Sequence, residues 1–434
     1  MTPMVIGVIG CLALLLLLMC SMPVAIVMGV VGVVGYAWVI SGKAALAMLS
    51  ADIYDIFSNY SLTVIPLFVF MGQVAFHTGI SRRLFAAANS WLSSLKGGLA
   101  MATIGACAAF GAICGSGPAT AATMAAVALP EMRRYKYDDA LSSGSVAAGG
   151  GLGMLIPPSV VFIVYGILTE QSIGKLFMAG VVPGLLVAVL FCLVISARCH
   201  FNPELAPPTV SVPWRARFKS LWGVTEMLVL FLFVMGGMFA GFFTPTEAAA
   251  VGAAGSVIIA AAGGNCSLKM LTAAAQETVR TSCMVLVIVA GATIFGHFLA
   301  VTGLPMSFAE GLAGLPVPSW VVIVLIILFY LVAGCFIDSL ALILLTVPIF
   351  YPVIQGFGYD PIWFGVMIVL VTQMGVITPP VGVNAYVVSG IDRSIPLQTV
   401  FRGAVPFLLA LVAACVLLIL FPQLATWLPG LAAL

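Results

Sequence analysis

The chain has 434 residues, of which 63% are hydrophobic and 7% are charged, whereas a typical soluble domain is about 45–50% apolar and about 25% charged. A single core could not hide so much apolar surface from water. The composition therefore excludes a soluble globular protein and predicts an all-α polytopic membrane protein. The formal net charge of +2 says little by itself, and we expect no nucleic-acid partner.

The first expected elements are two apolar helices at about 4–20 and 23–41. No Lys or Arg precedes the first helix, and the apolar run continues past Pro23, so we do not expect a cleavable signal peptide. Residues 42–60 place apolar side chains at helical spacing with charged ones between them. That pattern is typical of an amphipathic helix lying in the membrane interface, and a span follows at about 62–79.

An apolar stretch at 97–130 is interrupted in its middle by Gly-Ser-Gly-Pro at 115–118. Basic residues flank both of its ends, and the positive-inside rule places both flanks in the cytoplasm. Two full spans are one interpretation, but the half after the interruption is too short to cross a bilayer comfortably. The sequence therefore predicts a re-entrant hairpin whose tip lies near the middle of the membrane.

The rest of the chain completes the first half and then repeats its order of elements. The first half ends with a helix over 138–168, broken by a Pro-Pro pair, and a span over 172–198. The second half is expected to hold spans at 221–243 and 246–263, an amphipathic stretch at 267–283, a span at 284–303, a hairpin over 318–352, a broken helix over 361–390 and a last span over 397–428.

Matching motifs recur at a nearly constant offset along the two halves, with the hairpins at a slightly different one. Gly153 corresponds to Gly375, and the Pro pair at 157–158 corresponds to the pair at 379–380. An odd number of crossings separates equivalent points, so the second half should be upside down relative to the first. We predict two inverted repeats, residues 1–217 and 218–434, an arrangement typical of secondary transporters with the substrate site at the repeat interface.

The distribution of basic residues supports this layout. By the positive-inside rule, nearly all Lys and Arg fall in cytoplasmic segments, and only Lys43 and Lys175 fall outside. The layout predicts a multi-pass protein of the bacterial inner membrane with both termini in the periplasm.

Four interruptions in the apolar segments are candidates for the functional site: residues 115–118, 155–158, 334–339 and 377–380. Proline donates no hydrogen bond and blocks the helix before it, so each break frees backbone carbonyls. Free carbonyls inside a membrane are costly unless something binds them, and a desolvated Na⁺ is well suited. Single breaks of this kind also serve packing alone, so the prediction depends on the matched set. Side-chain oxygens near the breaks come from Ser116, Asp338, Ser339 and Thr378.

The helices that follow the breaks point their N-termini at one region. Ser116 precedes Pro118 as a cap precedes an N1 proline, and Asp338 stands either as an N-cap or as a cation ligand. None of the four breaks contains Lys or Arg. An anionic substrate would therefore be held by helix ends, hydroxyls and co-bound cations.

Four motifs resemble those of a known family. They are Gly-Ser-Gly-Pro-Ala-Thr at 115–120, Leu-Ile-Pro-Pro-Ser at 155–159, Thr-Pro-Thr-Glu-Ala at 244–248 and Ile-Thr-Pro-Pro-Val-Gly-Val-Asn at 377–384. Together they resemble the large membrane subunit of tripartite ATP-independent periplasmic (TRAP) transporters over essentially the whole chain. The resemblance implies an elevator-type carrier, with a scaffold and a mobile transport domain, that couples uptake of an organic acid to Na⁺.

The resemblance also implies partners and a substrate range. The partners are a small four-helix membrane subunit and a periplasmic solute-binding protein, and Na⁺ is the only cofactor. A C4-dicarboxylate, a sialic or other sugar acid, and a keto acid all remain open as substrates. A stand-alone Na⁺/dicarboxylate symporter is the alternative, and no nucleophile–base pair or metal motif indicates an enzyme.

The family pattern carries over onto specific residues. The first Na⁺ site is expected at Gly115, Ser116, Gly153, Ile156 and Pro157, and the second at Asp338, Ser339, Gly375, Thr378 and Pro379. Substrate-binding residues are expected to be Ser116, Pro118, Thr120, Ser159, Ser339 and Asn384. Asn384 could instead face a neighbouring helix.

Overall fold

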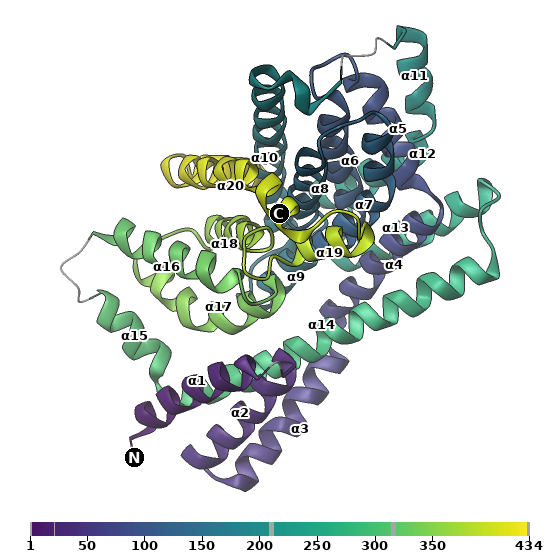
Figure 1. The fold of residues 1–434 in the computed structure, drawn as a ribbon. Coiled ribbons are helices and arrows are strands. Elements are labelled where there is room, and N and C mark those ends of the chain that lie inside the picture. The colour runs from purple at the N-terminus through teal and green to yellow at the C-terminus, as the bar shows by residue number, and fades with distance from the viewer. Residues whose placement is uncertain (1, 21, 208–211, 314–317, 432–434) are drawn as a thin grey trace.

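A computed structural model describes residues 2–20, 22–207, 212–313 and 318–431 (Figure 1). Every regular element in these residues is a helix. The first residue and the last three lie outside the described residues, so the orientation of the termini stays a prediction.

The helices of the first half follow the order expected from the sequence. They are α1 (Pro3–Met19), α2 (Val24–Val39), α3 (Gly42–Ser58), the short 3₁₀ turn η1 (Tyr60–Thr63), α4 (Val64–His77), α5 (Ile80–Leu92), α6 (Gly98–Cys114), α7 (Gly117–Arg134), α8 (Asp139–Leu155), α9 (Val160–Leu168) and α10 (Ile173–Phe201).

The second half contains matching elements. After the short turn η2 (Pro203–Leu205), which still belongs to the first half, they are α11 (Trp214–Trp222), α12 (Thr225–Phe239), α13 (Pro245–Ala262), α14 (Leu268–Thr302), α15 (Leu304–Ala313), α16 (Ser319–Gly334), α17 (Ser339–Gly356), α18 (Pro361–Gly375), α19 (Val383–Ile391), α20 (Leu397–Leu420) and α21 (Gln423–Leu431). The sequence-based division at residue 217 falls within α11, and it stays a prediction.

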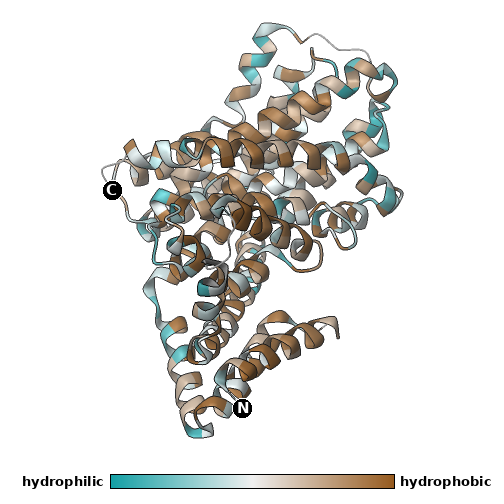
Figure 2. Ribbon diagram, turned by 90° about the vertical axis from the view of Figure 1, so that its left-hand side faces the viewer, coloured by the Kyte–Doolittle hydropathy of each residue, from teal (hydrophilic) through white to brown (hydrophobic). Residues whose placement is uncertain are grey.

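The protein is a multi-pass membrane protein. Seven helices of the described residues are long and apolar enough to cross a bilayer, and α11 with α12, which meet at a bend of 59°, would make eight. Large apolar side chains such as Leu16 and Leu185 are exposed on the outer faces of helices. Figure 2 shows brown, hydrophobic residues along those faces and teal residues mostly at helix ends and loops. This is the distribution expected where lipid is the solvent.

Two expected spans differ in the structure. The last one, over 397–428, ends at Leu420 and is followed by the separate helix α21, and the other difference lies in α14. The stretch at 267–283 and the span at 284–303 form a single helix, α14, of 35 residues. The equivalent segment of the first half is interrupted at η1, between α3 and α4. There the C-cap of α3 is Asn59, which is extended and whose side chain caps η1 by accepting the Ser61 amide at 2.9 Å. The residues of α14 have no such interruption, and the helix is continuous from Leu268 to Thr302.

The long helix α14 organises one side of the molecule. In Figure 1 it runs obliquely beneath the other helices, with the purple helices α1, α2 and α3 along its lower side. It packs against α2, α3 and α4. His297 Nδ1 on α14 lies 2.9 Å from the buried carboxylate of Asp52 on α3, within hydrogen-bonding distance. We call α1–α4 and α14 the arm helices.

The core on the other side is formed by the first segments of the two broken helices. Every residue of α8 after Asp139 is buried, and so is α18 from Trp363 to Gly375. Around this core the two halves interlock, because α7 packs against α19 and α17 packs against α9.

Equivalent contacts tie the two halves together at the far ends of α7 and α17. Arg133, at the end of α7, forms an ion pair with Asp392 at 3.0 Å and donates to the Ser394 hydroxyl at 2.7 Å. At the matching place on α17, the Tyr351 hydroxyl donates to the Thr169 carbonyl at 3.3 Å and accepts a hydrogen bond from Gln171 at 3.1 Å. The contact between the halves is therefore made by an ion pair at the end of α7 and by neutral hydrogen-bonding groups at the end of α17.

The ion pair should contribute measurably to stability. The pKa of Asp392 lies below its ordinary value, chiefly because the Ser394 hydroxyl donates to its carboxylate, with Arg133 adding to the effect. We expect Arg133→Gln and Asp392→Asn each to lower the stability by about 0.5–1 kcal/mol, a small value because Arg133 is half exposed. Because the folded pKa is depressed, this contribution is present at neutral pH and is lost as the pH falls through that pKa.

Thermal unfolding of the purified variants provides the measurement. The double variant should unfold at nearly the same temperature as either single variant, because both remove one interaction. Arg134→Gln, whose side chain is 74% exposed and pairs only locally with Glu131, is the matched control and should unfold like the parent. Additive losses in the double variant would contradict the pairing.

Candidate functional site

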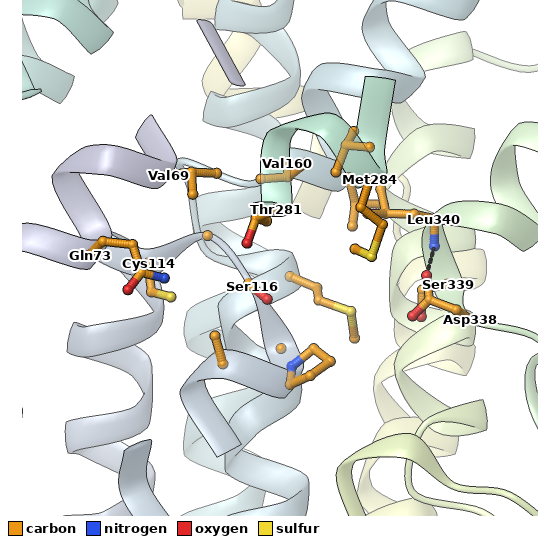
Figure 3. Close-up of a pocket in the computed structure, with 17 residues that line it drawn as sticks. Val69, Gln73, Cys114, Ser116, Val160, Thr281, Met284, Asp338, Ser339 and Leu340 are labelled. Atoms are coloured by element: carbon orange, nitrogen blue, oxygen red, sulfur yellow. Dashed lines mark hydrogen bonds between the residues drawn. The ribbon is translucent and has the colours of Figure 1, made fainter. Parts of the chain in front are cut away.

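A cavity of about 260 Å³ lies where the two hairpin tips approach each other. On one wall are the α6–α7 junction and part of the first broken helix, on another the start of α17, and on a third the arm helices α4 and α14 (Figure 3). The lining residues are Val69, Gln73, Cys114, Gly115, Ser116, Gly117, Pro118, Ala119, Met154, Val160, Val161, Thr281, Met284, Val285, Asp338, Ser339 and Leu340.

The tip of the first hairpin leaves a helix N-terminus open to the cavity. Gly115 ends α6 with a φ of 66°, a left-handed conformation that glycine adopts freely, and Ser116 is extended. The Ser116 carbonyl accepts the amide of Thr120 at 3.0 Å, while the Ser116 side chain caps nothing. Pro118 has no N–H, so the unbonded donors of this first turn in the described structure are the amides of Gly117 and Ala119.

The tip of the second hairpin is closed by its own carboxylate. Asp338 accepts a hydrogen bond from the Leu340 amide at 3.0 Å and so acts as the N-cap of α17. Figure 3 shows this bond, with the Asp338 carboxylate beside the cavity. The capping role expected from the sequence is confirmed, whereas cation binding stays a prediction. The adjacent Ser339 hydroxyl is buried and has no hydrogen-bond partner in the described structure.

Each broken helix is bonded to the hairpin tip of its own half. The Val160 amide donates to the Gly115 carbonyl at 3.3 Å, and the Val381 amide donates to the Cys335 carbonyl at 3.2 Å. Both Pro-Pro bonds at the breaks are cis. The two matched hydrogen bonds hold the residues around each break against the hairpin tip of the same half, as the paired motifs in the sequence predicted.

Two glycines allow the closest approach between break and tip. A Cβ on Gly153 would lie 2.9 Å from the Ser116 carbonyl oxygen, and a Cβ on Gly375 would overlap the carbonyl of Gly334. Real Cβ atoms do not come so close to backbone atoms, so any larger residue would force the tip away from the break.

The first expected Na⁺ set is thus assembled from adjacent backbone. Gly153 lies against Ser116, and Gly115 lies against the Pro158 carbonyl, 2.7 Å from an ideal Cβ position. Ile156 and Pro157 belong to the same break. The described residues contain no cluster of three His, Cys, Asp or Glu. A cation at this place would therefore be coordinated by carbonyl and hydroxyl oxygens, which suits an alkali ion.

The second expected set is divided between two places. Asp338 and Ser339 line the cavity, whereas Gly375, Thr378 and Pro379 lie behind it, at the break. The Thr378 hydroxyl donates to the Met374 carbonyl at 2.7 Å and keeps its lone pairs available.

The expected substrate residues are divided in the same way. Ser116, Pro118 and Ser339 line the cavity. The other three lie outside the lining and bond to backbone carbonyls: Thr120 to Ser116 at 2.8 Å, Ser159 to Met154 at 2.5 Å and Asn384 to Ala147 at 3.1 Å. A substrate contact for these three stays a prediction.

Sequence reasoning missed the arm-helix side of the cavity. Gln73 of α4 and Thr281 of α14 are polar residues in apolar stretches, which was the only signal available for them. Val69, Met284 and Val285 carry no signal, because an apolar residue in a membrane helix faces lipid, protein or a cavity without any change in pattern.

The sequence and the fold of the chain are similar to those of known proteins. The sequence profile described as "Tripartite ATP-independent periplasmic transporter, DctM component" matches residues 11–424. The C4-dicarboxylate TRAP transporter large permease protein DctM of Pseudomonas aeruginosa is 36% identical, with 90% of this chain and 93% of that protein covered. The sialic acid TRAP transporter large permease protein SiaM of Vibrio cholerae is also 36% identical, with 86% and 87% covered. Among solved structures, the Alcanivorax borkumensis YdaH transporter aligns with a TM-score of 0.58 at 16% identity, over 89% of each chain, which shows a shared fold.

The close approach at Gly153 can be tested by adding one methyl group. We expect Gly153→Ala and Gly375→Ala each to destabilise the protein by about 1–3 kcal/mol, the usual cost of overpacking a tight contact. The measurement is the unfolding temperature of the purified variants. Gly296→Ala in α14 is the control, since a Cβ there meets nothing within 4 Å. If Gly153→Ala unfolds at the same temperature as this control, the tip and the break do not touch as described.

Proposed function

The chain belongs to the family of the DctM component of tripartite ATP-independent periplasmic transporters, and from this membership we propose that it carries out Na⁺-coupled uptake of an organic acid. It is a transporter permease and not an enzyme. The single observation that carries the proposal is the cavity between the two hairpin tips, with the open N-terminus of α7 in its wall.

The substrate carboxylate would bind at that helix end. The amides of Gly117 and Ala119 have no partner in the described structure, and the Ser116 hydroxyl lies beside them. The N-terminus of an 18-residue helix carries about half a positive charge, so it attracts an anion without any basic side chain. This explains how a cavity with no Lys or Arg in its lining can hold an acid.

Sodium would bind at the two breaks, with the oxygens supplied by the residues named for the two sites. The tips lie against the breaks at Gly153 and Gly375, which concentrates carbonyl oxygens at two equivalent places. A bound cation at each would offset charge in a site of low dielectric and make binding of the acid depend on Na⁺. Coupling of acid uptake to Na⁺ then follows, because the acid at the N-terminus of α7 and the ions at the breaks would bind side by side.

The movement we propose is of the elevator type. The hairpins and broken helices (α6–α9 and α16–α19) form one interlocked unit that would move, and the arm helices would stay in place as the scaffold. In each half a hairpin tip is joined by a backbone hydrogen bond to a broken helix, and this repetition supports an inverted repeat with re-entrant hairpins.

The partners follow from the family. A tripartite system would add a small four-helix membrane subunit and a periplasmic solute-binding protein. This chain would lie with the small subunit in the bacterial inner membrane, with its own termini in the periplasm. The substrate would be delivered by the binding protein, and this chain would carry it across the bilayer.

The proposed sodium role of Asp338 is separable from its capping role. Asn caps a helix about as well as Asp, so Asp338→Asn should keep the fold. We expect it to raise the Na⁺ concentration for half-maximal uptake by about tenfold, because an anionic oxygen counts for more in a low-dielectric site. Ser116→Ala should produce a smaller rise, since carbonyls supply most of the ligands of the first site.

The measurement is uptake of labelled organic acids into proteoliposomes that hold the chain with its proposed partners, at varied Na⁺. Asp360→Asn is the matched control: Asp360 caps α18 through the amides of Ile362 and Trp363 and lies outside the cavity lining. Unchanged Na⁺ dependence in both Asp338→Asn and Ser116→Ala would contradict the proposed sites. Robust uptake by the chain alone would indicate a stand-alone symporter instead.

A further inference from the structure

The charges around the cavity bear on which organic acid it accepts. Asp338 is the one charged residue in the lining, and no Lys, Arg or His of the described structure lines it. The cavity therefore offers no basic side chain to any carboxylate. Each carboxylate of a ligand would need a helix end or a bound cation.

The two helix ends at the cavity are not equivalent. At α7, the Gly117 and Ala119 amides are unbonded and the Ser116 side chain leaves them uncapped. At α17, the Asp338 carboxylate already accepts the Leu340 amide. The first end can receive a carboxylate from outside, whereas the second is occupied by one from the chain itself.

A second ligand carboxylate near α17 would meet a like charge. Two carboxylates forced together in a partly desolvated site repel each other strongly. If Na⁺ binds at Asp338, as proposed above, it offsets that charge and leaves no net positive charge for another carboxylate. The α7 end remains the place where a negative group is favoured.

The other lining groups suit a neutral body. Ser339 is a residue of the lining that is only 3% exposed, and its hydroxyl has no hydrogen-bond partner in the described structure, so one buried polar group at the cavity is left for a ligand oxygen. Gln73 and Thr281 add two polar side chains on the arm-helix side, and the rest of the wall is mostly apolar, with Val69, Val160, Val161, Met284, Val285 and Leu340. Such a wall favours hydrocarbon and provides few partners for the hydroxyls of a sugar acid.

We propose that this cavity selects a small monocarboxylate with a largely apolar body, its carboxylate on the N-terminus of α7, over dicarboxylates and sugar acids. This inference rests on the proposed function and specifies its substrate class. It separates the chain from the similar Pseudomonas aeruginosa protein, whose name specifies C4-dicarboxylates.

A matched pair of probes tests the inference. 4-Methyl-2-oxopentanoate and 2-oxoglutarate share a 2-oxo acid head and are similar in length, but the first ends in methyl groups and the second in a carboxylate. Each is titrated against the purified chain in complex with its small membrane subunit at saturating Na⁺, without the binding protein, so that selection by the cavity alone is measured. The readout is the dissociation constant from ligand-dependent thermal stabilisation.

We expect the monocarboxylate to bind at least about tenfold more tightly than 2-oxoglutarate, because a second carboxylate has no favourable place. Asp338→Asn should reduce that ratio, because the Na⁺ bound there would no longer be neutralised by a carboxylate and would leave a positive charge that favours a second ligand carboxylate, while Asp360→Asn should leave the ratio unchanged. The ratio of the two dissociation constants is measured at saturating Na⁺, so a change in sodium affinity caused by Asp338→Asn affects both ligands equally and cancels. Ser339→Ala should weaken binding of the monocarboxylate.

Two outcomes overturn the inference. One is that 2-oxoglutarate or succinate binds as tightly as the monocarboxylate. The other is that no monocarboxylate stabilises the protein at saturating Na⁺. The proposed function fails separately: Na⁺-driven uptake of a dicarboxylate would overturn the inference and leave the proposed function intact, whereas uptake that ignores the Na⁺ gradient would overturn the function.

Discussion

The site depends on one constraint: a backbone carbonyl or amide inside a membrane must have a partner, because no water is there to supply one. Four helix interruptions place such groups in the interior of this protein. Two of the resulting gaps are closed by the chain itself, through the Val160–Gly115 and Val381–Cys335 hydrogen bonds. The carbonyls at the breaks and the amides at the start of α7 that these bonds do not use are the groups that we propose bind ligands.

The geometry around the breaks is maintained by packing rather than by charge. Gly153 and Gly375 let the breaks touch the tips, and the buried helices α8 and α18 fix their positions. The second helix of each hairpin packs against the other half, which joins the two halves into one unit. A rigid unit of this kind can carry a site through a membrane without disturbing the site, which an elevator mechanism requires.

Much of this arrangement could be predicted from sequence, because Gly and Pro act locally. The hairpin interruptions, both Pro-Pro breaks and the capping role of Asp338 depend on neighbouring residues, and the structure has them where they were expected. Contacts between distant segments left no local signal. The cavity walls on α4 and α14, and the bond from Asn384 to the Ala147 carbonyl, arise from tertiary packing. Thr120 and Ser159 instead bond to carbonyls four and five residues before them, and the motifs alone did not show whether these hydroxyls would face the backbone or the cavity.

The central claim is that the carbonyls and hydroxyls at the two breaks hold Na⁺. The most direct measurement is a high-resolution experimental structure of the complex in Na⁺, compared with one in which a bulky organic cation replaces it. The account predicts density within coordinating distance of the oxygens around Gly153 and around Gly375 in Na⁺ only. Breaks that are equally empty in both structures, in a preparation that performs Na⁺-driven uptake, would contradict it.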